Sequence, residues 1–353
     1  MSRPMTGRNI CELYAGAEHE KVVLWSDPQS DYRGIIAVHS TTLGPAVGGT
    51  RFWHYASDEE ASLDALRLSR GMTYKSALAG LPFGGGKSVI IGDNRTPRRE
   101  EIFRAHGRFV ESFGGCYVTA EDVGTTPADM EYVRMETNYV AGLAGGSGNP
   151  SPVTARGVLR AMQAAAKHRW GSDDLQGARV AVQGCGSTGY HLARELHARG
   201  ARLVVADVDA ARAARAAEEF GAAVVAPEEI AGAEADIYAP CALGGVINDQ
   251  SLARLKAGVV VGSANNQLGE ARHGDALEEL GVTYVPDYLA NAGGIINGCR
   301  ELLGWDVERT LEKVSAIYDT TLVVLSLARA EGVAAHRMAD RLVESRLAAA
   351  AAG

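Results

Sequence analysis

The chain has 353 residues, of which 46% are hydrophobic and 22% charged, and its formal net charge is −8 at pH 7. This length exceeds what one ordinary core requires and predicts two domains, and the composition is typical of a soluble globular protein. A negative net charge provides no electrostatic footprint for nucleic acid or for an anionic membrane, so neither is expected as a partner.

The cysteines and the lack of long apolar runs indicate the compartment. Five cysteines are scattered along the chain without a Cys-x-x-Cys pair, which argues against a disulfide framework and against a zinc ribbon. No apolar targeting stretch follows Met1, and no apolar run is long enough to span a bilayer. No spacing of histidines and cysteines suggests a catalytic metal. We therefore expect a cytoplasmic protein with no metal centre.

The first half of the chain mixes predicted strands and helices. Two stretches of β-type residues predict strands, at 22–25 and 34–38. A helix is predicted to begin after Ser57, because Ser57 and Glu60 form a capping-box pattern. A second helix is predicted over about 98–113, where two glycines follow. This half carries no nucleotide-binding fingerprint, and we expect a mixed α/β domain over residues 1–147.

The second half alternates short apolar strands with amphipathic helices. Residues 142–152 are rich in glycine, serine and proline and are predicted to form an interdomain hinge or the wall of a cleft. Helices are expected at about 153–168, 307–330 and 334–350, and strands at 179–183, 202–207, 223–225, 236–239, 258–262 and 283–285. Strands that alternate with helices form a parallel sheet covered on both faces. We therefore predict a doubly wound domain over residues 148–330, separated from the first domain by a cleft.

A glycine-rich turn follows the strand predicted at 179–183. Its sequence is Gly184-Cys185-Gly186-Ser187-Thr188-Gly189, and a helix comes next. In such a G-x-G-x-x-G turn the first glycine allows a tight bend and the second lets the backbone approach a pyrophosphate. The third lets helix and strand pack closely, and the helix N-terminus attracts the phosphates. We predict that a dinucleotide binds at this turn.

The residue that ends the next strand indicates which dinucleotide binds. Asp207 stands where a carboxylate can accept hydrogen bonds from the ribose hydroxyls and would repel a 2′-phosphate. This favours NAD over NADP. Arg212 and Arg215 lie close by in the sequence and leave NADP as the alternative.

Two lysines of the first half stand in unusual surroundings. Lys75 lies at the end of the helix that begins at Ser57, and Lys87 follows three glycines and precedes an apolar stretch, 88–91. A lysine in such a setting is expected to be partly desolvated, which lowers the pKa of its ammonium group toward that of a useful base. The alternative for each lysine is a solvated surface position.

Two adjacent acids, Glu121 and Asp122, come just after another predicted strand at 116–118. One of these carboxylates could transfer protons beside a lysine, or it could cap the helix that follows. The pattern therefore predicts a nucleotide-binding domain and a second domain with lysines and carboxylates, suited to hydride transfer on a substrate with an acidic group.

Eight short motifs resemble, in order, those of the glutamate/leucine/phenylalanine/valine dehydrogenase family. They are Gly48–Arg51, Gly71–Lys75, Gly84–Lys87, Ala120–Gly124, Ser147–Thr154, Ala239–Gly245, Ser263–Gln267 and Asn291–Gly294. They span about residues 43 to 304, and the likeness is greatest to the leucine-specific members. The resemblance implies an NAD-dependent enzyme that oxidatively deaminates an apolar L-amino acid to its 2-oxo acid and ammonia, and catalyses the reverse reaction.

The same resemblance implies roles for individual residues. Lys75 resembles the lysine that holds the substrate carboxylate, with Asn266 sharing that task, and Lys87 and Asp122 resemble the residues that activate water and transfer protons. The positions that resemble the family's cofactor contacts are Ser151, Thr154, Ala239, Cys241, Ala242 and Asn266, beside the glycine turn and Asp207. The family further implies a homo-oligomer, from a dimer to an octamer, and a C-terminal helix (about 331–353) that packs back on the first domain.

The substrate side chain is expected to meet an apolar pocket. Glutamate-specific relatives use a lysine for the side-chain carboxylate, and the matching position resembles Leu43, which would leave such a carboxylate desolvated and unpaired. The residues that the resemblance places in this pocket are Leu43, Gly44, Ala120, Ile295 and Gly298.

One pocket residue departs from the family pattern. Gly298 stands where leucine-specific relatives carry a valine, so a larger pocket, or a backbone that settles inward, is expected there. Branched-chain substrates are favoured and aromatic ones are the alternative. A non-catalytic NAD-binding protein with the same fold is a third hypothesis.

Overall fold

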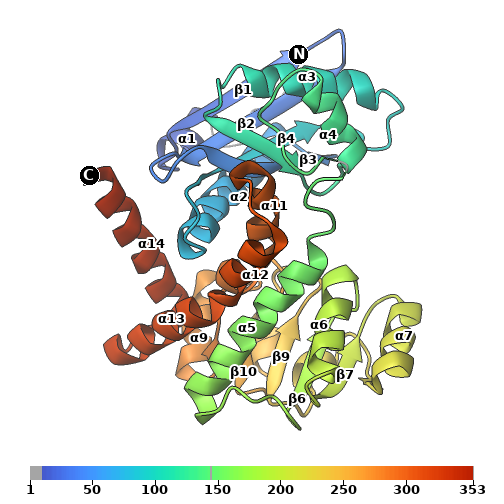
Figure 1. Cartoon of the computed structure of the whole chain (residues 1–353), viewed down its shortest axis with the longest axis vertical. Coiled ribbons are helices and arrows are strands. Elements are labelled where there is room, and N and C mark those ends of the chain that lie inside the picture. The colour runs from blue at the N-terminus through green and yellow to red at the C-terminus, as the bar shows by residue number, and fades with distance from the viewer. Residues whose placement is uncertain (1–9, 144, 353) are drawn as a thin grey trace, which may run out of the picture. The chain divides into compact units, whose positions relative to one another are not determined.

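The computed structural model describes residues 10–143 and 145–352. The chain folds into two compact units (Figure 1). The first unit comprises the residues up to Gly148, together with Glu301–Leu303 and the chain from Arg346 onward. The second unit comprises Asn149–Arg300 and Gly304–Ser345. The chain passes from the first unit to the second within the glycine-rich segment.

The first unit contains a five-stranded mixed sheet, in the order β1-β2-β4-β3-β5. Its strands are β1 (Lys21–Asp27), β2 (Tyr32–Ser40), β3 (Ala46–Trp53), β4 (Gly84–Ile91) and β5 (Tyr117–Glu121). The pairs β1–β2 and β2–β4 are antiparallel, whereas β4, β3 and β5 are mutually parallel neighbours. The strands predicted at 22–25 and 34–38 are confirmed as parts of β1 and β2.

Helices cover this sheet on both faces, which explains why β2 and β4 are buried along almost their whole length. The helices are α1 (Ile10–Ala15), α2 (Asp58–Leu78), α3 (Arg99–Glu111) and α4 (Pro127–Arg134). On β2, Ile35 packs in the cluster that includes α2, whereas Ile36 packs in the cluster that includes α3 and α4. Successive strand side chains point to opposite faces, so both faces need apolar residues.

The start of α2 confirms the capping signal in part. Ser57 is the N-cap, and its side chain accepts a hydrogen bond of 3.1 Å from the backbone N–H of Glu60. The carboxylate of Glu60 accepts instead from the N–H of Ala56, at 2.8 Å, one residue before the expected donor. The helix predicted at 98–113 is confirmed as α3.

The second unit is built on a six-stranded parallel sheet, in the order β11-β10-β9-β6-β7-β8. Its strands are β6 (Arg179–Gln183), β7 (Arg202–Ala206), β8 (Ala223–Val224), β9 (Ile237–Pro240), β10 (Val259–Val260) and β11 (Thr283–Tyr284). Every one of them overlaps a predicted strand. Because the strand order reverses between β6 and β9, this is the doubly wound Rossmann arrangement that the alternating pattern predicts.

Helices cover both faces of the parallel sheet as well. The elements are α5 (Ser151–Trp170), α6 (Ser187–His197), α7 (Ala210–Phe220), η1 (Ile230–Gly232), α8 (Asp249–Leu252), α9 (Ala271–Glu279), α10 (Asp287–Ala290), α11 (Gly293–Leu303), α12 (Val307–Ser315), α13 (Ile317–Glu331) and α14 (Ala335–Ala352). Ala181 of β6 packs with η1 and α9 in one core cluster, and α5 and α6 lie side by side. None of the helices in the described part of the chain could cross a membrane.

Two predictions of local structure are wrong in detail. The single helix expected over 307–330 is divided at Ala316 into α12 and α13. The strand expected after Lys87 begins earlier, at Gly84, so Lys87 lies inside β4.

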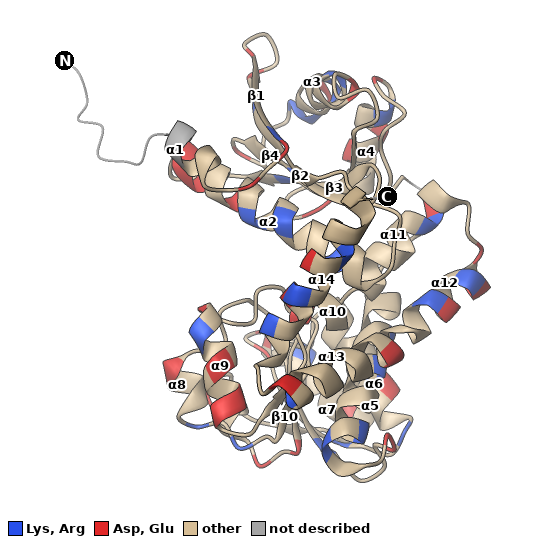
Figure 2. Cartoon of the chain, turned by 90° about the vertical axis from the view of Figure 1, so that its left-hand side faces the viewer, with Lys and Arg blue, Asp and Glu red and all other residues tan. Residues whose placement is uncertain are grey.

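On the surface, acidic and basic side chains alternate along the outer helices, as on α12 (Figure 2).

Gly85, one of the three glycines before Lys87, is explained by the packing of the protein on itself. A Cβ atom added to Gly85 would lie 2.0 Å from the backbone nitrogen of Thr73, so α2 already fills the space. Because this helix also carries Lys75, the missing side chain allows the two lysine-bearing elements to pack directly together.

Replacing Gly85 by Ala is expected to lower the free energy of unfolding by about 1–3 kcal/mol. Backbone atoms, which cannot move aside as a flexible side chain can, block the new methyl group. Gly71→Ala is the matched control in α2: its Cβ position has no atom within 4 Å, and we expect a gain of about 0.5–1 kcal/mol. Urea unfolding measures both. Equal stability of the two variants would contradict the packing argument.

Candidate active site

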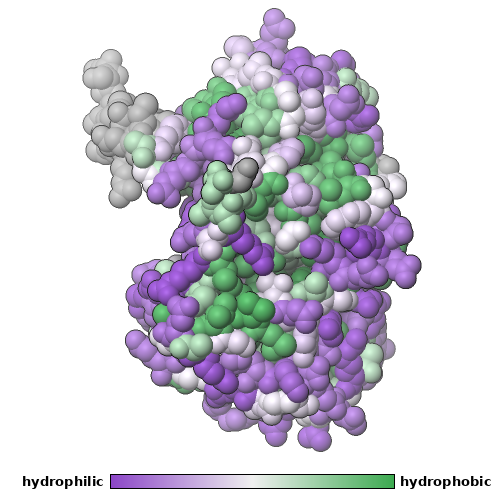
Figure 3. Space-filling model, turned by 60° about the vertical axis from the view of Figure 1, so that its left-hand side comes forward, coloured by the Kyte–Doolittle hydropathy of each residue, from purple (hydrophilic) through white to green (hydrophobic). Residues whose placement is uncertain are grey.

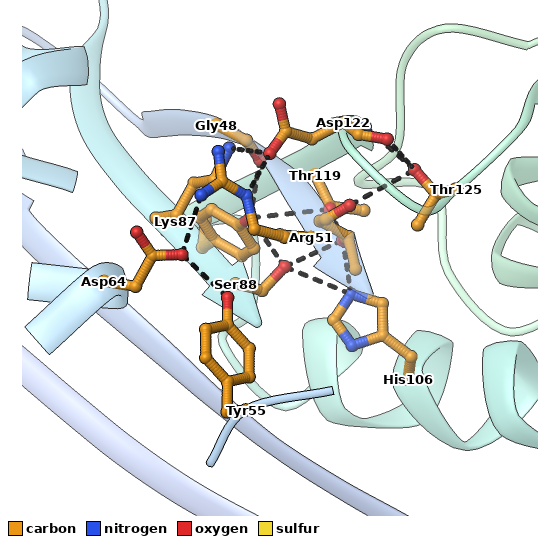
Figure 4. A network of polar contacts seen from close by, with 12 residues as sticks. Gly48, Arg51, Tyr55, Asp64, Lys87, Ser88, His106, Thr119, Asp122 and Thr125 are labelled. Atoms are coloured by element: carbon orange, nitrogen blue, oxygen red, sulfur yellow. Dashed lines mark hydrogen bonds and ion pairs between the residues drawn. The ribbon is translucent and has the colours of Figure 1, made fainter. Parts of the chain in front are cut away.

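A buried lysine and a carboxylate from a different strand form the centre of the candidate site (Figure 4). Lys87 is 5% exposed, and its Nζ lies 2.8 Å from Oδ2 of Asp122. Lys87 lies on β4 and Asp122 directly follows β5, with β3 between the two strands. The expected partnership of these two side chains is therefore present, and an ammonium group that is so deeply buried requires the anion.

A third charged side chain, Arg51 of β3, completes this cluster. Its Nε lies 3.1 Å from Oδ2 of Asp122, and its Nη1 lies 2.8 Å from Oδ2 of Asp64 on α2. The same oxygen of Asp64 accepts a hydrogen bond of 2.7 Å from the hydroxyl of Tyr55. Arg51 ends the first of the family motifs but was given no role from the sequence, and Asp64 and Tyr55 were not singled out. Its place in the motif Gly48–Arg51 is the signal that could have identified Arg51.

The charges around Asp122 decide its ionisation. Burial by itself would raise the pKa of this carboxyl group, but the attraction of Lys87 and Arg51 outweighs burial and lowers the pKa to about 2. Asp122 is therefore a carboxylate at neutral pH. The neighbouring Glu121 has its pKa raised by burial and by the nearby carboxylates of Asp122 and Glu301.

The opposite face of the same strands carries an uncharged network that fixes their alignment (Figure 4). Thr50, next to Arg51, is hydrogen-bonded to Ser88, Thr119 and the Nε2 atom of His106, at 2.7, 2.6 and 2.8 Å. Burial lowers the pKa of His106 to about 3, so its imidazole is neutral at working pH. The network joins β3, β4, β5 and α3, and it holds the strand positions beside Lys87 and Asp122.

The turn after β5 excludes the alternative that Asp122 caps a helix. Thr126 is the N-cap of α4 and forms a capping box with Asp129. Asp122 instead donates its backbone N–H to Oγ1 of Thr125, at 2.8 Å. Gly49 of β3 makes room for this turn, since a Cβ atom there would lie 2.9 Å from the Cβ of Asp122.

The other expected residues of the first unit lie around the start of β4. Lys75 is half-buried in the last turn of α2, which packs on β4. Gly44, which follows the half-buried Leu43, accepts a hydrogen bond of 3.1 Å from the N–H of Gly84. Ala120 is half-buried near the end of β5. These positions belong to the sheet region that carries the Lys87–Asp122 pair.

In the second unit the glycine turn has the expected geometry. Gly184 has a φ of +95°, which glycine adopts readily, and a Cβ atom on Gly189 would lie 1.9 Å from the carbonyl oxygen of Gly184. The helix α6 begins at Ser187 with Gly186 as its N-cap, and no side chain caps it. The first N–H groups of α6, which include Thr188, are therefore not capped by a side chain and are suited to bind phosphate.

Asp207 supports this turn directly. Its Oδ2 accepts a hydrogen bond of 2.6 Å from the N–H of Cys185, and its Oδ1 accepts one of 2.8 Å from the N–H of Asp209. The carboxylate is thus held in one orientation at the end of β7. Arg212 is engaged by Asp209, at 3.3 Å.

The end of β9 brings further expected residues to the glycine turn. A Cβ atom on Gly184 would lie 2.7 Å from the Cβ of Ala242, and Cys241 donates its N–H to the carbonyl of Gln183 at 2.7 Å. Ala239 lies on β9 itself, which pairs with β6.

Asn266 is connected to the same region through its backbone. It has a φ of +51°, its carbonyl accepts from the N–H of Gly245, and its own N–H donates to Oδ2 of Asp287 at 2.9 Å. Residues after β9 and residues after β10 therefore meet at one edge of the parallel sheet.

The remaining expected residues lie on α5 and α11. Ser151 is the first residue of α5, and the Oγ1 atom of Thr154 donates to the carbonyl of Pro150 at 2.9 Å. A Cβ atom on Gly294 would lie 2.9 Å from this Oγ1, so α11 begins against α5. Ile295 and Gly298 stand three residues apart on α11 and share a helix face.

A parallel sheet with a glycine turn at its reversal point, and a separate unit with a buried ammonium–carboxylate pair, are typical of nucleotide-dependent oxidoreductases. The Glu/Leu/Phe/Val dehydrogenase dimerisation-domain model matches residues 19–139, and the Glutamate/Leucine/Phenylalanine/Valine dehydrogenase model matches residues 145–214 and 206–322. The chain belongs to the glutamate/leucine/phenylalanine/valine dehydrogenase family.

Individual relatives support this assignment over nearly the whole chain. A leucine dehydrogenase of Geobacillus stearothermophilus is 55% identical over 94% of this chain and 91% of its own length. A valine dehydrogenase of Streptomyces coelicolor is 48% identical over 94% of this chain and 93% of its own. The crystal structure of L-tryptophan dehydrogenase from Nostoc punctiforme superposes with a TM-score of 0.87 at 42% identity, covering 98% and 100% of the two chains. The protein is an amino-acid dehydrogenase of an NAD(P)-dependent family.

The lowered pKa of Asp122 makes stability depend on pH. Since the carboxyl group titrates at about 2 in the folded protein and ordinarily at 3.8, its contribution is complete above pH 3.8 and disappears as the pH falls through 2. Asp122→Asn is expected to lower the free energy of unfolding by about 2 kcal/mol at pH 7 and by much less near pH 2. Urea unfolding at the two pH values measures the difference. Asp58→Asn, in the exposed pair with Arg33, is the control and should change little at either pH.

Proposed function

We propose that the protein catalyses the NAD-dependent oxidative deamination of an apolar L-amino acid, with leucine and other branched-chain amino acids preferred, and the reverse reductive amination. The reaction converts amino acid, water and NAD⁺ to 2-oxo acid, ammonia, NADH and a proton. The observation that carries the proposal is the buried pair of Lys87 and Asp122, at 2.8 Å. Identity of 55% with a leucine dehydrogenase supports the substrate class.

Four residues have defined tasks in this proposal. The ammonium of Lys75, with the amide of Asn266, holds the substrate carboxylate and so orients the α-carbon. Lys87 activates the water that adds to the imino acid and transfers protons as ammonia leaves. Asp122, which is ionised at working pH, stabilises the ammonium form of Lys87 after each proton uptake.

The second unit suits NAD. The glycine turn after β6, the N-terminus of α6 and Asp207 would hold NAD⁺, which would supply the acceptor for the hydride of the substrate α-carbon. The uncapped N-terminus of α6 supplies N–H groups for the pyrophosphate, and the carboxylate of Asp207, fixed by two backbone N–H groups, would receive the ribose hydroxyls and repel a 2′-phosphate. Ser151 and Thr154 are proposed beside the nicotinamide, with Ala239, Cys241, Ala242 and Asn266 as the remaining contacts.

The choice of amino acid depends on the apolar pocket proposed for Leu43, Gly44, Ala120, Ile295 and Gly298. Leu43 offers no charge to a glutamate side chain, which disfavours glutamate. One observation favours larger, aromatic substrates as a second candidate: no atom lies within 4 Å of the Cβ position of Gly298, so the backbone has not closed the space. An L-tryptophan dehydrogenase of Nostoc punctiforme is also 46% identical to this chain.

A homo-oligomer is proposed as the working form. The first unit matches a domain described as the dimerisation domain of the family. Its edge strand β1 exposes Leu24 and Trp25, at 51% and 38%, and apolar residues gather in patches on the face shown in Figure 3. Exposed apolar side chains on a free strand edge are typical of an interface. Light scattering of the purified protein measures the state.

The purified protein is expected to produce NADH from NAD⁺ and leucine at alkaline pH, and less efficiently NADPH from NADP⁺. Lys87→Ala should abolish turnover because the proton-transferring group is lost, while NAD⁺ binding, measured by calorimetry, should persist. Lys256→Ala, which removes an exposed lysine paired with Glu234, is the control and should retain full activity. Wild-type turnover in Lys87→Ala would contradict the role of Lys87, and no NADH from any amino acid would support the non-catalytic alternative.

Gly298→Val is expected to narrow the substrate range. Because no atom lies within 4 Å of the Cβ position, a side chain can start there, and the kcat/KM ratio of phenylalanine or tryptophan to leucine should fall by about tenfold to a hundredfold. A kinetic panel of leucine, valine, phenylalanine, tryptophan and glutamate measures the ratio. Gly16→Val, also at an open position, serves as the control. An unchanged ratio would show that Gly298 does not border the substrate side chain, and glutamate as the best substrate would contradict the pocket as a whole.

A further inference from the structure

The side chain of Arg51 is unusually constrained for an arginine in a sheet. It is 23% exposed and bonds to two carboxylates from different elements, Asp64 on α2 and Asp122 after β5. Asp64 is in turn held by Tyr55. The result is a continuous chain of contacts that ends at Lys87 and runs through alternating charges: Lys87, Asp122, Arg51 and Asp64 (Figure 4).

The bonds to Asp122 are distributed unevenly over its two oxygens. Both cations, Lys87 at 2.8 Å and Arg51 at 3.1 Å, contact Oδ2. Among the described residues none gives a hydrogen bond or ion pair to Oδ1, and Figure 4 shows this oxygen turned away from the cluster. One oxygen of the carboxylate is thus fixed by two cations, and the other has no partner among the described residues.

Without Arg51 the carboxylate would be less constrained. A carboxylate held by one lysine can turn about its Cβ–Cγ bond and present either oxygen to the ammonium, because Lys is a compact point charge on a flexible stem. The planar guanidinium of Arg51 is itself fixed from the far side by Asp64, so it prevents this rotation.

We propose that Arg51 is a positioning residue for the deamination reaction: it fixes Asp122 so that Oδ2 stays bonded to Lys87 while Oδ1 remains free to meet the substrate's amine. This inference rests on the proposed function. The ion pairs of Arg51 are to Asp64 and Asp122, so it acts on Lys87 through Asp122. Asp64 and Tyr55 form its support.

The arginine also influences the charge of Asp122. Removing it takes away one of the two cations that offset burial, so the pKa of Asp122 should rise from about 2 by about one to three units. The other titratable groups that interact with Asp122 are Lys87, Glu121, Tyr55 and Tyr117. Asp64 is different: when its charge is lost, Arg51 remains cationic and Asp122 stays ionised.

The experiment compares Arg51→Gln, Arg51→Lys and Asp64→Asn in the full-length enzyme, with Arg33→Gln as the matched control in an exposed pair with Asp58. For each we measure kcat and KM with leucine, the solvent deuterium isotope effect on kcat, and the carboxyl ¹³C titration of Asp122, whose signal is identified by its loss in Asp122→Asn. The isotope effect is informative because partial unfolding lowers the apparent kcat but leaves the isotope effect of the remaining folded enzyme unchanged.

Arg51→Gln is expected to reduce kcat by up to about a hundredfold with KM for leucine unchanged, to increase the isotope effect and to raise the pKa of Asp122. Arg51→Lys should keep the pKa of Asp122 close to its wild-type value but retain only part of kcat. A lysine supplies the positive charge but lacks the planar guanidinium group that fixes the orientation of the carboxylate. Asp64→Asn should lower kcat and leave the pKa low. Arg33→Gln should match the wild type.

The outcomes separate this inference from the proposed function. A wild-type protein without activity on any amino acid would overturn the proposed function and, with it, the role of Arg51 in that reaction. An active wild type, with an unchanged isotope effect and Asp122 titration in Arg51→Gln, would overturn the inference alone. Should Arg51→Gln fail to fold, the same measurements on Arg51→Lys decide: a kcat and isotope effect equal to the wild type would overturn it.

Discussion

A buried ammonium group requires an anion beside it, and the anion that pairs with Lys87 is Asp122, which follows the second strand along the sheet from β4. Lys87 lies on β4 and Asp122 follows β5, so the strand between them, β3, must keep both of its neighbours in register. The hydrogen bonds that Thr50 makes on the opposite face provide this alignment. Gly49 and Gly85 allow the turn and α2 to come close enough. Much of the first unit can thus be understood as the framework for one ion pair of 2.8 Å.

The second unit uses a carboxylate in a related way. Asp207 accepts hydrogen bonds from two backbone N–H groups and so holds the glycine turn in shape. Asp122 instead forms ion pairs with two side-chain cations. In both cases groups of the protein fix the orientation of the anion before any ligand binds. A preoriented charge does not have to reorganise during the reaction, which is the usual source of electrostatic catalysis and selectivity.

Much of the fold could be predicted from the sequence because its signals are local. The strands of the second unit stand between clear turns, and the glycine turn after 179–183 has the spacing that a dinucleotide-binding turn requires. By contrast, β3 was not predicted, since Gly48 and Gly49 weaken its strand character and its stability comes from neighbours. The break at Ala316 has no proline or glycine to mark it. Within the site, Lys87 and Asp122 were accessible through the family motifs, whereas Asp64 and Tyr55 act only through Arg51 and gave no signal of their own.

The path of the chain has a consequence for how the protein can be divided. The backbone passes between the units after Gly148, on both sides of Glu301–Leu303, and again after Ser345. Glu301 accepts the N–H groups of Gly142 and Ser147, and Arg346 donates to the carbonyl of Ala77, so late segments complete the early unit. A gene fragment that ends near residue 148 would therefore encode an incomplete unit. We therefore expect recombination between relatives to preserve the first unit only where all of these segments are inherited together.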